Sequence, residues 1–364
     1  METTKLFQPL SLGRLELKHR VVMAPLTRLR CDKDHVILPI AKEYYAQRAS
    51  APGTLIIAEA TMPSLKHGFG DHTPGIWSDA QIKSWKEITD TVHDKGCFMY
   101  LQICLPGRAA AEGYECLSSS AVPIDAQSRV PKEMNEEEIQ EAIDITVKAA
   151  KNALVAGFDG VELHGANGYL IDQFIQDNCN QRTDKWGGSV ENRSRFALEL
   201  VAAVAEAIGS DRLGLRLSPW SEFQSMKMKE PVPQFSHLVR ELKKYKLAYL
   251  HLIESRVNNW ADKEKTEGID FLIDIWDNQS PVLVAGGFKL DSAKTAVDSE
   301  YAKYDTAVVF GRYYLSTPDL VFRLQHGLEP NQYDRNTFYT PVQPEGYLDY
   351  PFSKEYESAA KGQA

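Results

Sequence analysis

A strand-like run that ends in three polar side chains is the segment of this chain best suited to chemistry. Residues 158–163 form a short, mainly apolar run that predicts a buried strand. His164 ends that run, and Asn167 and Tyr169 follow within the reach of one turn. A neutral histidine and an asparagine can both donate hydrogen bonds to one carbonyl oxygen. Drawing charge onto that oxygen lowers the barrier to hydride addition at a conjugated carbon, so the pair predicts an oxyanion site.

Tyr169 is the candidate acid of the same segment. A phenol has a reference pKa near 10, so it keeps its proton at pH 7 and can donate it during a reaction. The structural alternatives are a strand-end histidine and a core tyrosine that make only internal hydrogen bonds.

Two glycine turns later in the chain predict a phosphate cradle. Gly286 and Gly287 end one apolar run, and Gly311 and Arg312 end the next. Glycine lets backbone N–H groups approach a phosphate closely, and an arginine beside it offers a bidentate partner. The alternative is a pair of tight turns without a ligand.

The elements that must position these residues repeat regularly. Short apolar runs alternate with amphipathic, helix-like segments, and continuous apolar runs are typical of parallel strands covered on both faces. The runs span residues 21–24, 54–59, 97–102, 158–163, 213–217, 248–253, 281–285 and 306–310. The segments span residues 80–95, 136–156, 192–208, 233–245, 270–276 and 290–297, and Ser78 is an expected N-cap.

Eight such units predict an α/β fold, a (β/α)₈ TIM barrel formed by a single domain over residues 1–364, with an open sheet as the alternative. Residues 7–17 predict an N-terminal hairpin that closes the barrel bottom, and residues 104–133 a long loop after strand 3. The aromatic-rich tail from Tyr333 is expected to pack on the barrel. Function is then expected at the carboxyl ends of the strands, where the polar residues gather.

Composition excludes several other classes of protein. The 364 residues include 43% hydrophobic and 25% charged residues, which is ordinary for a soluble globular protein. The net charge of −9 without a basic run argues against nucleic acid and anionic membrane surfaces. No apolar run approaches the roughly 18 residues that span a membrane. We therefore expect a cytoplasmic protein whose five cysteines are reduced. A monomer or a homodimer is expected.

Motif searches narrow the chemistry further. No G-x-G-x-x-G follows a strand, so no dinucleotide fold is expected. Glu162 and His164 alternate correctly to share one side of a strand, but no further cluster accompanies them, so no metal site is expected. A serine or cysteine nucleophile with a histidine partner cannot be placed.

The segment from Val161 to Phe174, with Gln181–Asp184 and Trp186–Arg193, resembles the signature of the Old Yellow Enzyme family, and similarity extends over nearly the whole chain. The resemblance implies tightly bound FMN, NADPH or NADH as reductant, and a small-molecule substrate that is an activated alkene, reduced by ping-pong turnover. It makes His164 and Asn167 the substrate-binding pair and Tyr169 the proton donor.

The resemblance also assigns residues to the flavin ring. It implies contacts from Pro25, Thr27 and Ala60 to the flavin edge. Gln102 is expected at the pyrimidine, and Arg216 beside the N1–C2 region that becomes anionic on reduction. For each residue alone, ordinary strand-end hydrogen bonding is the alternative.

Two positions concern the substrate. Tyr339 matches a substrate-contact position of the family. Cys104 stands where the family usually has an aromatic residue, so we expect a wider pocket, unless an aromatic residue from elsewhere, such as Trp220 or Phe223, compensates. The overall character is similar to fungal members, including chanoclavine-I aldehyde reductase types, so a flavin-dependent isomerase or reductase of an ergot-type aldehyde is an alternative function. A barrel lyase or aldolase without flavin, and a flavin-binding sensor without turnover, are the remaining alternatives.

Overall fold

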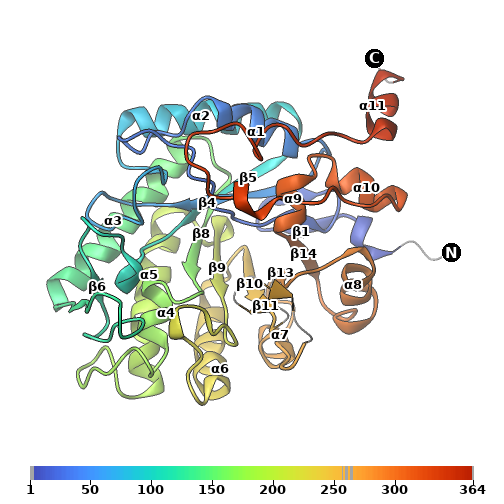
Figure 1. Cartoon of the computed structure of the whole chain (residues 1–364). Helices are drawn as coiled ribbons and strands as arrows, with labels where there is room; N and C mark the ends of the chain where they lie inside the picture. The colour runs from blue at the N-terminus through green and yellow to red at the C-terminus, as the bar shows by residue number, and fades with distance from the viewer. Residues whose placement is uncertain (1–3, 256, 259–260, 263–264, 363–364) are drawn as a thin grey trace.

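The barrel strands close into a complete ring. The computed structural model describes residues 4–255, 257–258, 261–262 and 265–362. Eight parallel strands pair in the order β10-β13-β14-β3-β4-β5-β8-β9 (Figure 1). They are β3 (Val21–Met23), β4 (Leu55–Thr61), β5 (Phe98–Ile103), β8 (Gly160–Gly165), β9 (Leu213–Leu217), β10 (Tyr249–Ile253), β13 (Val282–Ala285) and β14 (Thr306–Phe310). The predicted TIM barrel is confirmed, and the open-sheet alternative is wrong.

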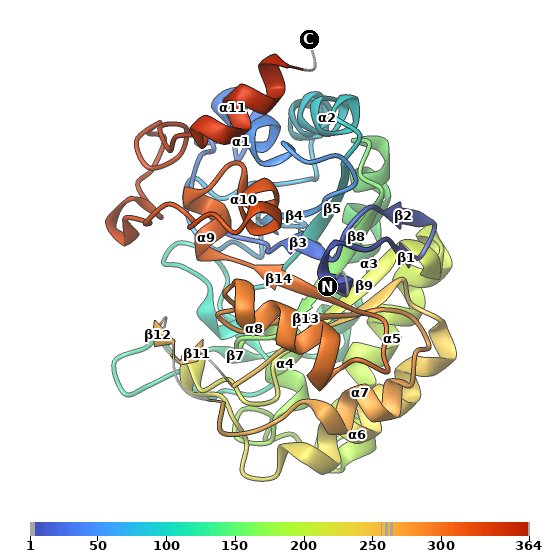
Figure 2. The same ribbon diagram turned by 90° about the vertical axis from the view of Figure 1, so that its right-hand side faces the viewer.

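Helices cover the outside of this ring, as both views show (Figures 1 and 2). Ser78 caps α2 as predicted, because its hydroxyl accepts a hydrogen bond from the backbone N–H of Gln81. The main helices are α1 (Ile40–Arg48), α2 (Asp79–Asp94), α3 (Glu136–Val155), α5 (Val190–Ile208), α6 (Pro231–Leu242), α7 (Asp270–Trp276), α8 (Leu290–Thr295) and α10 (Leu320–His326). Shorter ones are α4 (Leu170–Ile175), α9 (Arg312–Ser316) and α11 (Lys354–Lys361).

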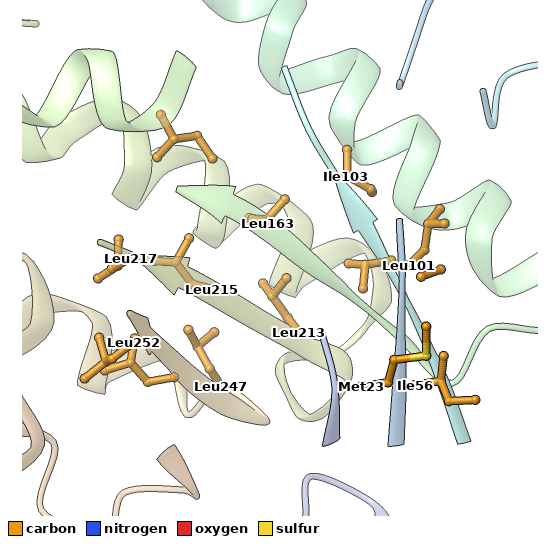
Figure 3. Close-up of a cluster of buried hydrophobic side chains, with 14 of the residues drawn as sticks. Met23, Ile56, Leu101, Ile103, Leu163, Leu213, Leu215, Leu217, Leu247 and Leu252 are labelled. Carbon is orange, nitrogen blue, oxygen red and sulfur yellow. The ribbon is translucent and has the colours of Figure 1, made fainter. Parts of the chain in front are cut away.

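The strands are apolar on both faces because one face packs against the helices and the other packs in the barrel interior. One buried cluster fills the space between strands and helices, and Figure 3 shows part of it, with Leu101, Leu163 and Leu215 on neighbouring strands. A second, smaller cluster fills the lower barrel interior and includes Leu55 and Tyr249. Two opposed apolar layers explain why the runs are continuous and do not alternate.

An antiparallel hairpin closes the bottom of the barrel, as predicted. It consists of β1 (Leu10–Leu12) and β2 (Leu15–Leu17), whose leucines join the lower cluster. Gly13 lies in its turn with φ of +56°, and a Cβ there would lie 2.1 Å from the carbonyl oxygen of Asp211, just before β9. This close approach to the amino end of a barrel strand requires glycine.

The long loop after β5 and the C-terminal tail frame the opposite end. The loop contains the short strands β6 (Leu117–Ser118) and β7 (Lys132–Glu133), and a further two-stranded antiparallel sheet consists of β11 (Val257–Asn258) and β12 (Ala261–Asp262). The Arg28 guanidinium donates to the carbonyl oxygens of Phe338 and Gly346 at 3.1 and 2.7 Å, which fixes the tail on the barrel as expected. Within the described residues, none of the helices has the length and apolarity to cross a membrane.

Candidate active site

A cavity of about 560 Å³ opens at the carboxyl end of the barrel strands, within the size range of small-molecule sites. Strand ends and the loops that follow them form its walls. All the predicted site residues except Cys104 line it: Pro25, Thr27, Ala60, Gln102, His164, Asn167, Tyr169, Arg216, Gly286, Gly287, Gly311, Arg312 and Tyr339.

His164 reaches this cavity from the carboxyl end of β8, where it pairs in register with Arg216 on β9. Burial, with the nearby charge of Arg216, lowers the pKa of His164 well below its usual value. The ring is therefore neutral at pH 7 and has one N–H to donate. Its Nδ1 is buried without a hydrogen-bond partner among the described residues. A ligand oxygen would satisfy such an orphaned polar atom.

Asn167 stands on a left-handed turn with φ of +57°, a conformation that asparagine adopts more readily than most residues. Its backbone N–H donates to the hydroxyl of Ser218 at 2.7 Å. Its carbonyl oxygen accepts from the side-chain amide of Gln224 at 3.1 Å. These two contacts attach the turn to the loop after β9. Both are made by backbone atoms of Asn167, and the residue lines the cavity.

Tyr169 lies beside both residues. Its ring centroid is 4.9 Å from that of His164. Burial raises the pKa of the Tyr169 phenol above its usual value, although a hydrogen bond from Gln224 acts in the opposite direction. The phenol therefore carries its proton at neutral pH and borders the same space as the His164 and Asn167 donors.

A buried carboxyl group supports the turn from below. Asp172 on α4 accepts hydrogen bonds from the Gly168 backbone N–H at 2.9 Å and from the Gln176 amide at 2.8 Å. Burial raises the pKa of Asp172 to about 7. Gly168 itself has φ of +76°, and a Cβ there would lie within 3 Å of Gln224 and Met226. Glycine is therefore required for the loop after β9 to pack against the turn.

The groups expected to hold a flavin lie around the same cavity and fit FMN. The Nε atom of Arg216 is buried without a hydrogen-bond partner among the described residues, so it is available to a ligand. Gly286 and Gly287 both have positive φ, at +156° and +68°. The strand before them, β13, pairs with β14, which ends just before Gly311, so the two glycine turns are neighbours. Arg312, next to Gly311, contacts the hydroxyl of Tyr333 at 3.2 Å.

Cys104 is the predicted site residue that the structure does not bring to the cavity wall. Its side chain is buried, and burial raises the pKa of its thiol. Phe69, from the segment after β4, lines the cavity and packs against Tyr169 with ring centroids 5.1 Å apart. The space beside Tyr169 is therefore bordered by an aromatic ring from elsewhere in the chain. Of the two residues expected to compensate, Phe223 lines the cavity, whereas Trp220 packs on Phe271 outside it.

Several residues of the site were not predicted. Phe288, Phe338 and Arg335 line the cavity, and Gln224 contacts the turn at Asn167. Phe288 follows the Gly286-Gly287 turn directly, which is a signal that sequence reasoning could have used. Phe338 and Arg335 come from the tail, whose path over the barrel has no periodic signal.

Glu162 is hydrogen-bonded inside the barrel. Its carboxylate lies 2.8 Å from the ring of His251. Among the described residues, no group of three or more histidine, cysteine, aspartate or glutamate side chains is arranged to hold a metal ion.

Comparison with known proteins gives this geometry a context. Residues 5–331 match the NADH:flavin oxidoreductase / NADH oxidase family. The chain is 53% identical to the chanoclavine-I aldehyde reductase fgaOx3 of Penicillium roqueforti, over 99% of this chain and all of the relative. It is 52% identical to the NADP-dependent oxidoreductase lnbE of Aspergillus flavus, over 97% of each chain.

The structure agrees with these sequence matches. It superposes on the Old Yellow Enzyme of Pichia sp. AKU4542 with a TM-score of 0.90 at 36% identity, covering 96% of this chain and 94% of the other. The predicted resemblance to Old Yellow Enzymes is thereby confirmed.

Proposed function

Because this chain belongs to the NADH:flavin oxidoreductase / NADH oxidase family, we propose that it reduces the activated C=C bond of α,β-unsaturated carbonyl compounds. FMN, when bound, would carry hydride from NADPH or NADH to the substrate. Gln102, Arg216 and Thr27 would hold its ring, and the turns at Gly286, Gly287, Gly311 and Arg312 its phosphate. Pro25 and Ala60 would complete the ring site through their backbones.

His164 and Asn167 would bind the carbonyl oxygen of the substrate. Both can donate a hydrogen bond, and both face a buried cavity in which such bonds are stronger than in water. As negative charge develops on the oxygen, the two donors stabilise it, which is the function of an oxyanion hole. Tyr169 would then give its proton to the α-carbon, while Tyr339 contacts the substrate at the cavity mouth.

The observation that supports this proposal is the meeting of two independent sets of residues in one cavity. Donors for an oxyanion and a protonated phenol come from β8 and the turn after it. Groups for a flavin come from β3, β4, β5, β9, β13 and β14. A lyase or aldolase that forms a Schiff base needs a lysine, and the described residues that line the cavity include none.

A second candidate rests on the similarity to a chanoclavine-I aldehyde reductase. The substrate would then be an unsaturated aldehyde of ergot type, and the outcome could be reduction or isomerisation of its double bond. The 52% identity to an NADP-dependent relative favours NADPH as the reductant. We further propose that residues 1–364 form one FMN-binding domain, cytoplasmic, and a monomer or homodimer.

A spectrum and a turnover assay test the proposal together. Purified protein should be yellow, and heat should release FMN in a stoichiometric amount. Anaerobic NADPH should bleach the flavin, and 2-cyclohexenone should restore its colour and yield cyclohexanone. A colourless protein, or one that releases FAD, would contradict the proposal. FMN that NADPH cannot reduce would instead identify a sensor, and chanoclavine-I aldehyde used as substrate would separate the ergot-type alternative.

A further inference from the structure

A carboxylate buried in the barrel lies directly behind the flavin-facing residues. Glu162 on β8 is fully buried, and one side chain from β5 and two from β10 donate hydrogen bonds to it. Its Oε1 accepts from the amide nitrogen of Gln102 at 2.7 Å. Its Oε2 accepts from the Tyr249 hydroxyl at 3.0 Å and from His251 Nδ1 at 2.8 Å. Both oxygens are therefore occupied, as a buried carboxylate requires.

The contact with Glu162 fixes the orientation of the Gln102 amide. A carboxylate only accepts hydrogen bonds, so the NH₂ end of Gln102 must face it. The carbonyl oxygen of Gln102 is then turned away from Glu162, and Gln102 lines the cavity. A glutamine amide can both donate and accept hydrogen bonds, but the contact with Glu162 makes Gln102 present its acceptor oxygen. The pyrimidine edge of a flavin carries a matching donor, N3–H, between two carbonyl groups.

Glu162 also carries a negative charge inside the barrel, behind the cavity-lining Gln102. Burial would raise the pKa of Glu162, but His251, Arg216 and the hydrogen-bond donors outweigh it and hold the pKa below its usual value. Burial lowers the pKa of His251, so this ring is neutral at pH 7. Among Glu162, His251 and Arg216, the formal charges are thus on the carboxylate and the guanidinium. The Nε of Arg216 has no hydrogen-bond partner within the described part of the chain, so it can bind a ligand while the nearby Glu162 carboxylate offsets part of the guanidinium charge.

We propose that Glu162 is a positioning residue for FMN, which orients the Gln102 amide toward N3–H and limits how strongly Arg216 favours the reduced, anionic flavin. This inference rests on the proposed function, because it presupposes that FMN binds in the cavity. It assigns two separable roles to one side chain: hydrogen bonding to Gln102 selects the flavin edge, and charge sets the balance between oxidised and reduced FMN.

The first role is tested on the unaltered chain. Full-length protein freed of flavin is titrated with FMN and with 3-methyl-FMN, in which a methyl group replaces the N3 proton. Loss of one hydrogen bond with a buried acceptor left unpaired predicts binding at least about tenfold weaker for 3-methyl-FMN. Equal affinities would overturn the orientation role while leaving the proposed function intact. Failure to bind either flavin would overturn the proposed function itself.

The second role is tested by the ratio of the dissociation constants of oxidised and reduced FMN, obtained from the reduction potential of the holoenzyme. Glu162→Gln should raise this ratio about tenfold, which for a two-electron couple is a positive shift of about 30 mV. It should also abolish discrimination against 3-methyl-FMN, since the Gln102 amide could then turn over. Glu162→Asp keeps the charge but not the reach, so it should lose the discrimination and leave the ratio within about twofold of the wild type.

Tyr249→Phe is the matched control for disturbance of the network. It removes one donor to Glu162 but keeps the carboxylate and its contact with Gln102. We expect both the flavin discrimination and the ratio to stay close to the wild-type values. A potential shift in Tyr249→Phe equal to that in Glu162→Gln would show a merely structural role and overturn the inference. An unchanged potential in Glu162→Gln would overturn it as well.

Discussion

Phe69 packs edge-on against Tyr169, with ring centroids 5.1 Å apart and an angle of 77° between the ring planes. Edge-to-face contact is a favoured geometry for two aromatic rings. Phe69 comes from the segment after β4, whereas the expected aromatic position, two residues beyond Gln102, is the buried Cys104. The aromatic wall beside Tyr169 is therefore supplied by a different strand–helix connection.

Phe69→Ala should widen the active-site cavity. Removing the ring opens space next to Tyr169, so kcat/KM for bulky enones should rise about tenfold relative to that for 2-cyclohexenone. The measurement is the ratio of the two kcat/KM values. An unchanged ratio would show that Phe69 does not limit substrate size.

Cys104 provides the control for this prediction. Cys104→Ala should leave the ratio unchanged because the thiol does not border the cavity. Cys104→Trp should lower the melting temperature and reduce activity toward small and large enones alike, since an indole inserted into a packed interior overpacks it. A loss of activity in Cys104→Trp that is confined to bulky enones would instead place Cys104 at the cavity wall, as its position in the family implies.

His164→Ala and Asn167→Ala should each slow enone reduction about 10²-fold or more, because each removes a donor to the developing oxyanion. FMN content should stay close to stoichiometric in both variants, and reduction by NADPH should continue. Phenol ligands should lose their long-wavelength charge-transfer band with the flavin. Stopped-flow absorbance follows these steps separately, and unchanged reduction of 2-cyclohexenone by the double variant would reject the assigned roles.

Much of this arrangement follows from local sequence. The barrel strands were predictable because burial on both faces makes each run continuously apolar, and polar residues at their carboxyl ends then identify the site. The pairing of His164 with Arg216 follows once β8 and β9 are known to be neighbours. Boundaries differ by a few residues, as at β8, because strand ends depend on hydrogen bonds to the neighbouring strand.

The remainder depends on contacts between distant segments. Phe69 reaches Tyr169 from the segment after β4, and no periodic pattern in the sequence predicts this contact. In the sequence, Glu162 and His164 could be considered as a pair of metal ligands. In the structure, the hydrogen-bond donors to Glu162 come from β5 and β10. Helix α4 is short and starts directly after Tyr169, so it has too few residues for a helical pattern to appear.

Asp172 should make stability fall as the pH rises. Its pKa is raised from an ordinary 3.8 to about 7 in the folded protein, so the folded state binds the proton more tightly than the unfolded chain. The associated stability is fully present below about pH 4 and is lost as the pH rises through about 7. A pKa difference of this size corresponds to at most about 4 kcal/mol.

Asp172→Asn removes this titration and keeps an oxygen for the Gly168 N–H. The free energy of unfolding, measured with urea from pH 4 to pH 8, should therefore fall in the wild type relative to the variant. Comparing the two proteins cancels the contributions of other buried groups, such as Glu59, whose pKa burial also raises to about 7. A constant difference across this range would mean that Asp172 stays ionised in the fold.

Tyr169→Phe should separate the two halves of the catalytic cycle. Reduction of the flavin by NADPH needs no proton from this residue, so its rate should stay nearly unchanged. Reoxidation by an enone should slow, because Tyr169 is the protonated side chain that lies beside His164 and Asn167.

Nitroalkenes should be affected less by Tyr169→Phe, since a stabilised nitronate can leave before protonation. An ergot-type aldehyde should be diverted toward isomerisation, because hydride can return before the α-carbon is protonated. Stopped-flow traces of each half-reaction decide the matter: slower flavin reduction with unchanged enone reduction would assign the proton to water or another residue.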